Sequence, residues 1–286
     1  MEHVTDLDLP GGGHTSIVGI DGGGSGDPVV ILLPALGVAA GYYGPLAAAL
    51  AAEGVAVLAA DFPGQGVSRP LAGRKNDFGY AAVSDVVVAA TVAVAQERHA
   101  GRPLAFLGHS FGGQVALVHL ATHSSPVSAL VLIGSGSPYW RGFPKRLKLL
   151  VQTQTLGVVA AVRGHWPGDR VGFGGRQPRK QMREWARFAR RGDLAVERGE
   201  HIGEPNFSGV ALPVLAVTLD HDALAPQGSV DDLAHKLTGA RVEHRFVTRP
   251  AGEDGPAFDH FTWVRHPGSF AGEVAAWLRE ALGQGR

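Results

Sequence analysis

The chain contains no cysteine, and its charges balance, since Lys and Arg together number 26 and Asp and Glu also number 26. The lack of cysteine excludes disulfide bonds, catalysis by a thiolate and zinc sites with cysteine ligands. Because the net charge is zero, the chain as a whole gives no electrostatic reason to expect a nucleic-acid or anionic-membrane partner. The function must therefore be sought in the remaining residue types and their spacing.

Long apolar runs are also missing, because no stretch approaches the roughly 20 apolar residues that a membrane-spanning helix needs. The first residues, MEHVTDLDLPGGG, carry acids where a secretion signal would carry a basic region. We therefore expect a cytoplasmic protein without a membrane span. A length of 286 residues, 45% of them hydrophobic, is enough to bury a sizeable core.

Strands alternate with helices over the first half of the chain. After a hairpin around HTSIVGID come four apolar runs typical of strands covered on both faces, namely PVVILLPALG, VAVLAAD, PLAFLGH and VSALVLIGSG. Helical stretches lie between them, such as residues 80–99, which are too many for a strand. This alternation predicts an α/β fold with a mostly parallel, doubly wound sheet and helices on both faces.

The alternation stops between residues 138 and 207. This segment contains three of the five tryptophans, and from Arg141 to Arg198 it has fourteen Lys or Arg against four acids. It contains one clear helix, since Pro178 suits a first turn and Gly192 a stop. The alternation then resumes with LPVLAVTLD, GSVDDLAHKLT, RVEHRFVT and FAGEVAAWLREAL. We predict a core formed by residues 1–137 and 208–286 and an inserted helical cap, residues 138–207.

Ser110 follows the strand PLAFLGH and precedes the helix FGGQVALVHLATH, within the motif G-H-S-F-G-G. A strand-turn-helix setting is the one that a nucleophile elbow requires, and the small residues at positions 108, 112 and 113 permit a sharp turn. The start of a helix also offers unpaired N–H groups to a developing oxyanion. Because the chain has 41 glycines, the motif alone does not identify a nucleophile, and the partners of Ser110 must be found.

A serine nucleophile needs a base, and that base needs an acid to orient it. Asp220 and Asp222 follow the strand PVLAVTL, and His260 follows the strand RVEHRFVT in the segment FDHFTWVRHPG. In an open α/β sheet, ligands bind at the carboxyl ends of the strands, where all these residues are predicted to lie. The order Ser, Asp, His along the chain is the order found in α/β-hydrolases.

Other acids and histidines have poorer settings. His244 lies inside a strand and His266 directly precedes Pro267, whereas His109 adjoins Ser110 on a sharp turn and is expected to be structural or pocket-lining. Asp61 also ends a strand, but it precedes Ser110 and better suits a role in stabilising a turn.

The chain resembles the α/β-hydrolase superfamily over nearly its whole length. DFPGQGVS is similar to a D-x-x-G-x-G-x-S turn of that superfamily, and GHSFGGQ is similar to its elbow. More narrowly, GHSFGGQ, GSPYW, the tryptophan-bearing cap helix and DHFTWVR resemble bacterial serine hydrolases of the monoglyceride-lipase and serine-aminopeptidase-like branch. The resemblance implies Ser110 as nucleophile, His260 as general base and Asp222 as acid, because Asp222 stands four residues before Pro226; Asp220 is the alternative.

The same resemblance implies an oxyanion hole made by the backbone N–H groups of Leu36 and Phe111. This chain departs from the superfamily at two points. It has Pro34 and Ala35 where His-Gly is usual, so Leu36 is assigned by position, and Asp259 replaces the glycine that often precedes the histidine. A mechanism through an acyl-enzyme requires neither a metal nor an organic cofactor.

Five aromatic residues just past predicted strand ends could line an apolar acyl pocket or pack the cap on the core: Tyr42, Tyr43, Tyr139, Trp140 and Trp263. The basic cap shows no nucleic-acid-binding module, so we expect a solvated basic face, with an acidic or phosphate-bearing substrate as an alternative.

The predicted function is hydrolysis of a small to medium carboxylic ester by a serine hydrolase acting on a small-molecule acyl substrate. The same site would also serve a thioesterase, a lactone or amide hydrolase, or an acyl transferase or cyclase. A ligand-binding relative with an idle triad is the alternative from another class. The sequence leaves the oligomeric state open.

Overall fold

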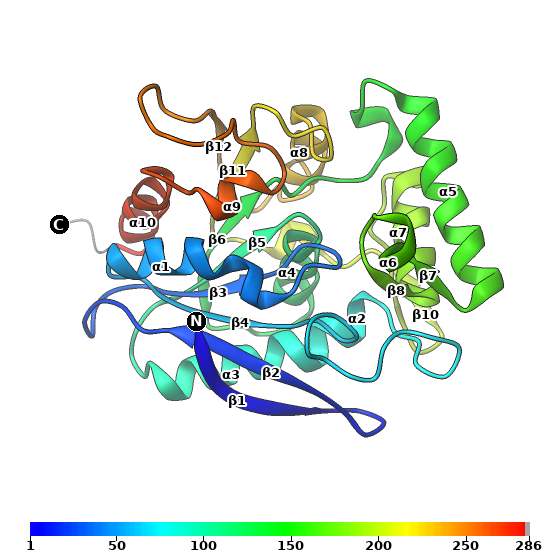
Figure 1. Cartoon of the computed structure of the whole chain (residues 1–286), viewed down its shortest axis with the longest axis horizontal. Helices are drawn as coiled ribbons and strands as arrows, with labels where there is room; N and C mark the ends of the chain where they lie inside the picture. The colour runs from blue at the N-terminus through cyan, green and yellow to red at the C-terminus, as the bar shows by residue number, and fades with distance from the viewer. Residues whose placement is uncertain (284–286) are drawn as a thin grey trace.

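The computed structural model describes residues 1–283 and contains an eight-stranded sheet in the order β1-β2-β4-β3-β5-β6-β11-β12 (Figure 1). Six neighbouring strands of this sheet, β4, β3, β5, β6, β11 and β12, run parallel to one another, while β2 pairs antiparallel with both β4 and β1. The predicted α/β class with a mostly parallel sheet is confirmed. The strands are β1 Glu2–Leu9, β2 Gly13–Ile20, β3 Val29–Leu33, β4 Ala56–Ala60, β5 Leu104–His109, β6 Val127–Ile133, β11 Pro213–Leu219 and β12 Arg241–Val247.

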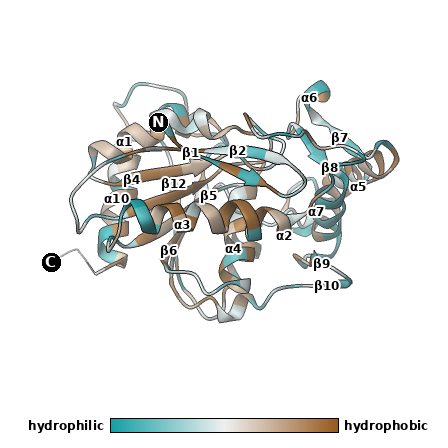
Figure 2. Ribbon diagram, turned by 90° about the horizontal axis from the view of Figure 1, so that it is seen from below, coloured by the Kyte–Doolittle hydropathy of each residue, from teal (hydrophilic) through white to brown (hydrophobic). Residues whose placement is uncertain are grey.

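Two apolar layers enclose the sheet because successive side chains of a strand point to opposite faces. In β3, Ile31 and Leu33 join one core cluster, and Val30 and Leu32 join the other. The first cluster includes the segment Tyr80–Arg98 and α4 (Phe111–Thr122), and the second includes α1 (Gly44–Ala52) and α10 (Phe270–Ala281). Figure 2 shows the apolar strands between these helices. Burial on both faces explains why the strands read as continuous apolar runs.

The segment Tyr80–Arg98 is one helical run made of α2 (Tyr80–Ala82), a π-helical stretch (Val83–Val88) and α3 (Ala89–Arg98). By length and composition it could cross a membrane, which differs from the expectation that no stretch of the chain could. Half of its most apolar window is buried within the protein. Its side chains Val83, Val87 and Val88 pack on the sheet, as in a core helix, so this run is weak evidence for a span.

Residues 138–207 form helices and short strands beside the sheet, at the right of Figure 1. The predicted helix is present as α7, which follows the extended Pro178 and ends before a left-handed Gly192. The elements of this segment are η3 Trp140–Gly142, α5 Arg146–Arg163, β7 His165–Pro167, α6 Gly168–Val171, β8 Arg176–Pro178, α7 Arg179–Arg191, β9 Val196–Arg198, β10 His201–Gly203 and η4 Phe207–Gly209. The short strands pair as two small sheets that the sequence did not predict. We refer to residues 138–207 as the cap.

Buried Glu184 of α7 connects the cap to the core. Its carboxylate accepts hydrogen bonds from the backbone N–H of Tyr80 at 2.9 Å and of Glu197 at 2.8 Å. Burial raises the pKa of Glu184 above its usual value, while these two donors lower it. The cap is thus tied to the first turn of the long core helix. The other elements are η1 Ala40–Tyr43, α8 Gln227–Ala234 and α9 Thr262–Arg265.

Candidate active site

Ser110 occupies the sharp turn between β5 and α4. Its backbone has φ 53° and ψ −118°, and among residues 1–283 it is the only residue other than glycine with a positive φ. A non-glycine residue in this region is strained and is held there only by its surroundings. The turn also needs Gly108, because a Cβ at that position would lie 2.4 Å from the Cα of Gly113. The motif therefore has the backbone geometry of a nucleophile elbow.

His260 and Asp222 form a buried hydrogen-bonded pair near this turn. His260 Nδ1 lies 2.7 Å from Asp222 Oδ2, and the carboxylate of Asp222 is fully buried. The other carboxylate oxygen accepts the backbone N–H groups of Leu224 at 2.8 Å and Ala225 at 2.9 Å. These two donors fix the carboxylate in one orientation. The pair leaves Nε2 of the imidazole available for another partner.

The imidazole of His260 lies next to the elbow, since its ring centroid is 4.8 Å from that of His109, which directly precedes Ser110. Within residues 1–283, the Ser110 hydroxyl makes no hydrogen bond to His260 or to another group. Such contacts are often long without a bound substrate and shorten in the Michaelis complex.

The alternative residues lie in other surroundings. Asp220 Oδ2 is 3.4 Å from His221, and its Oδ1 is buried without a partner among the described residues. His244 faces Asp231 at 3.3 Å, and the side chain of His266 is exposed. The carboxylate of Asp61 accepts the backbone N–H groups of Ala40 and Val67, as expected for a residue that stabilises a turn.

The backbone N–H groups of Leu36 and Phe111 have no acceptor within the described part of the chain. Phe111 is the first residue of α4, so its N–H has no partner within the helix. Leu36 stands between two occupied donors, because Ala35 N–H bonds to the Tyr43 hydroxyl at 2.8 Å and Gly37 N–H bonds to Gln65 Oε1 at 3.0 Å. Two free donors are thus available where the oxyanion hole was predicted.

Tyr43 joins the loop that carries Leu36 to the elbow. Its hydroxyl accepts the Ala35 N–H and lies 2.8 Å from Nδ1 of His109, with both rings fully buried. Burial raises the pKa of Tyr43, so its hydroxyl stays protonated beside His109. Burial also holds the pKa of His109 well below its usual range, which keeps this imidazole neutral beside His260. No local sequence signal identifies this link, because its partners are far apart in the chain.

Replacing Tyr43 with phenylalanine tests this link. We expect kcat of the reaction at Ser110 to fall about tenfold with a smaller change in KM, because the loop carrying the Leu36 N–H loses its anchor. Unfolding should also become easier by about 1–3 kcal/mol, since the Ala35 N–H and His109 Nδ1 are left buried and unpaired. Steady-state kinetics and urea unfolding measure both effects. Tyr42→Phe is the matched control, and a Tyr43→Phe enzyme with unchanged kcat would contradict the assignment.

A glycine-rich loop of the cap lies directly on the loop that carries Leu36. A Cβ on Gly37, which has φ +77°, would come within 2.3 Å of the carbonyl carbon of Gly174 and 2.6 Å of the nitrogen of Gly175. Gln177, itself buried, donates to the Gly174 carbonyl at 2.5 Å and so holds this cap loop in place. The cap therefore contacts the core beside the Leu36 N–H.

The five predicted substrate-binding aromatics lie in different surroundings. Tyr43 and Trp263 are fully buried, and the Trp263 indole donates to the His260 carbonyl at 3.1 Å. Both residues therefore help to hold the site residues in place. The Tyr42 hydroxyl donates to the Phe261 carbonyl at 3.0 Å. Trp140 is partly buried beneath Arg141, whose guanidinium lies 5.2 Å from its ring centroid. Contact of any of them with a substrate stays a prediction.

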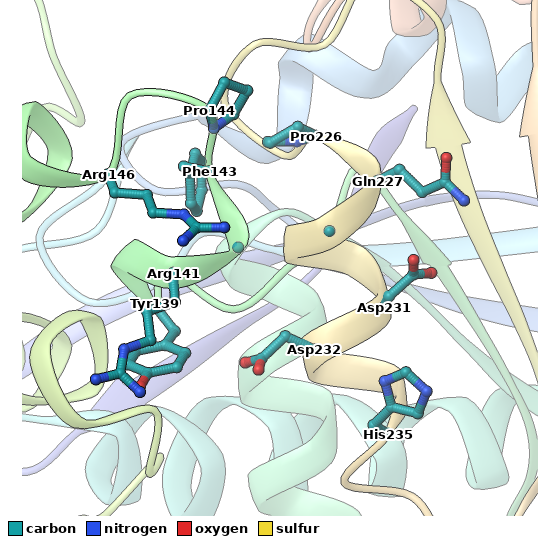
Figure 3. A pocket seen from close by; sticks show the side chains of 12 residues that line it. Tyr139, Arg141, Phe143, Pro144, Arg146, Pro226, Gln227, Asp231, Asp232 and His235 are labelled. Carbon is teal, nitrogen blue, oxygen red and sulfur yellow. The ribbon is translucent and has the colours of Figure 1, made fainter.

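Tyr139 lines a cavity of about 820 Å³ between the start of the cap and α8 (Figure 3). Arg141 and Arg146 lie on the cap side of this cavity, and Asp232 projects from α8 on the other side. Pro226, at the start of α8, lines it four residues after Asp222.

The family model described as serine aminopeptidase, S33, matches residues 24–166 of this chain, which include the elbow. No curated protein sequence matches the chain. Solved structures with the same fold include an enol-lactonase from Burkholderia xenovorans LB400, which is 18% identical with a TM-score of 0.58 and coverage of 96% of this chain and 99% of the other.

Two further structures share this fold. A thermostable carboxyl esterase from Bacillus coagulans is 16% identical, with a TM-score of 0.60 and 99% coverage of both chains. A meta-cleavage product hydrolase from Pseudomonas fluorescens IP01 is 17% identical, with a TM-score of 0.60 and 98% coverage of both chains. At these identities the likeness concerns the fold.

Proposed function

Because the chain belongs to the serine aminopeptidase S33 family of α/β-hydrolases, we propose that it hydrolyses carboxylic esters with Ser110, His260 and Asp222 as its catalytic triad. The observation that carries this proposal is the 2.7 Å pair of His260 Nδ1 and Asp222 Oδ2 beside the strained Ser110. A glycine-rich loop without function has no physical reason to maintain a buried His-Asp pair beside a strained serine.

The chemistry follows from the positions of these groups. Ser110 Oγ attacks the carbonyl carbon while His260 Nε2 takes the hydroxyl proton, and the Asp222 carboxylate stabilises the imidazolium that forms. The N–H groups of Leu36 and Phe111 donate to the oxyanion of the tetrahedral intermediate. His260 then protonates the leaving alkoxide, an acyl-enzyme remains on Ser110, and water activated by His260 releases the acid.

Two structures that share this fold, an enol-lactonase and a carboxyl esterase, support esters as the substrates. Both names describe enzymes that act on ester bonds. The same triad would also cleave thioesters, lactones or amides, or transfer the acyl group, because pocket shape and water access select the leaving group and the acceptor.

The proposal is tested with a panel of p-nitrophenyl esters of increasing acyl length beside aminoacyl p-nitroanilides. We expect turnover of at least one ester, with kcat/KM varying with chain length, and slower cleavage of the anilides. Release of p-nitrophenol above the rate of a Ser110→Ala control is the measure. A wild-type enzyme that cleaves only anilides would replace the esterase by an aminopeptidase, and one that cleaves neither class would favour a ligand-binding protein with an idle triad.

A further inference from the structure

The outer face of α5 is apolar and exposed. Four of its aliphatic side chains lie mostly in solvent: Leu147 at 70%, Val151 at 65%, Val158 at 63% and Val162 at 68% exposed. Their spacings of four, seven and four residues place them on one side of the helix. We call these four residues the α5 stripe. Helix α5 forms the outer edge of the cap, away from the sheet (Figure 1).

This face lacks the charges that surface helices normally carry. Residues 149–162 contain no Asp, Glu, Lys, Arg or His, and the exposed residue between Val151 and Val158 on the same side is the neutral Thr155. The opposite side of the helix packs on α7 through buried Thr153, Leu156 and Ala160. The stripe is therefore not needed to hold the cap together, and it forms an apolar patch that is unusual on a protein surface.

Positive charges bracket the stripe. Lys145 and Lys148 lie at the start of α5 and Arg163 lies at its end, all on exposed positions, while Arg146 lines the cavity beside α8. None of the four makes an ion pair within residues 1–283, whereas two cap acids are paired with α7, Glu197 with Arg183 and Asp193 with Arg187. The patch thus presents an apolar centre between uncompensated cations.

We propose that α5 docks the cap onto an anionic lipid surface, with the α5 stripe inserted among the acyl chains near the headgroups and the flanking cations on the headgroup phosphates. A helix that combines an apolar face with flanking Lys and Arg lies in the plane of a membrane interface. An 18-residue helix is about 27 Å long, enough to engage several lipids at once. The docking is interfacial, and no part of the chain needs to cross the bilayer.

The charges at the two ends of α5 argue against a second copy of the chain as the partner that covers the α5 stripe. Antiparallel pairing of two α5 helices would set Lys145 and Lys148 of one copy beside Arg163 of the other, and parallel pairing would bring identical cations together. Both arrangements place like charges at the ends of the contact, which is destabilising. An anionic partner removes this repulsion, and the convex, aliphatic stripe suits a deformable lipid layer.

Cosedimentation with vesicles tests the proposal. We expect the protein to bind phosphatidylcholine vesicles containing about one third phosphatidylglycerol roughly tenfold more strongly than pure phosphatidylcholine vesicles, and to dissociate as salt is raised. Replacing the whole α5 stripe by glutamine, a good helix former, should lower binding at least about tenfold. Replacing Lys145, Lys148 and Arg163 by glutamine should remove the preference for the anionic lipid.

Matched controls separate the stripe from exposed apolar residues in general and from catalysis. A Val67→Ser, Leu71→Ser, Phe246→Ser variant alters exposed residues outside the cap and should bind vesicles like the wild type. The stripe variant should keep its circular dichroism spectrum and its hydrolysis of a soluble p-nitrophenyl ester. Ser110→Ala should bind vesicles normally, so failure of the esterase proposal does not affect this one.

Three results would overturn the proposal. The first is absence of vesicle binding by the wild type, and the second is binding that the stripe variant retains in full. The third is a wild-type dimer, detected by light scattering, that becomes a monomer in the stripe variant, because a second copy would then cover α5.

Discussion

Replacing Ser110 by alanine is expected to lower kcat for the best p-nitrophenyl ester by about 10⁵- to 10⁶-fold, and replacing His260 by alanine should cost about the same. Each substitution removes one half of a single proton-transfer step, so the nucleophile is either absent or left protonated. The double variant should be no slower than either single variant, because groups that act as a unit are not additive. Rates are measured at enzyme concentrations high enough for the residual activity to exceed the background from contaminating esterases.

His266→Ala is the matched control for the histidine substitution, since His266 is exposed and follows His260 by one short helix. It should leave kcat unchanged within about twofold. Thermal unfolding should show all four variants folded. A Ser110→Ala enzyme that retains more than a small part of the wild-type rate, or a double variant with additive losses, would contradict the proposed mechanism.

Substitution of the two candidate acids should give unequal losses. Asp222→Asn is expected to lower kcat by about 10³- to 10⁴-fold, because an amide neither stabilises the imidazolium nor holds the tautomer that leaves Nε2 unprotonated. Asp220→Asn should cost less than about tenfold, since Asp220 lies beside exposed His221 rather than His260. Both substitutions preserve side-chain volume, so kcat and KM from full saturation curves compare them directly. A larger loss in Asp220→Asn would reverse the assignment of the acid.

The parallel core was predictable because its signal is local. In β3, Val30 and Ile31 point to opposite faces, yet both are buried, so the strand reads as a continuous apolar run. The helix over residues 80–99 was also predicted, since its length rules out a strand. Its π-helical stretch, Val83–Val88, was not predicted, because nothing in the run of valines distinguishes i+5 from i+4 hydrogen bonding.

The cap was harder to predict in detail. Helix α7 has an apolar side that faces the protein and clear end signals at Pro178 and Gly192. Helix α5 has exposed aliphatic residues on its outer side as well as buried ones on its inner side, so no single apolar face indicates its boundaries. The short strands β7 and β8 contain only three residues each, too few for a periodic pattern.

The three candidate catalytic residues could be predicted from the sequence because each follows a strand and because they occur in a characteristic order along the chain. Ser110, Asp222 and His260 each stand just past a strand or its following loop, and the parallel sheet gathers those ends on one edge. The supporting residues could not be found this way. Tyr42 and Tyr43 are adjacent in sequence and identical in type, yet one hydroxyl bonds to Phe261 and the other links Ala35 to His109. Only the three-dimensional arrangement separates them.

The most direct test of the central claim is to treat the wild-type protein with a fluorophosphonate and locate the adduct by intact and peptide mass spectrometry. A fluorophosphonate phosphonylates a serine only where a neighbouring base activates it and oxyanion donors receive the charge. The account predicts one adduct per chain, on Ser110, with labelling abolished in Ser110→Ala and greatly slowed in His260→Ala. Stoichiometric labelling of another residue, or an enzyme that hydrolyses esters while Ser110 remains unlabelled, would contradict it.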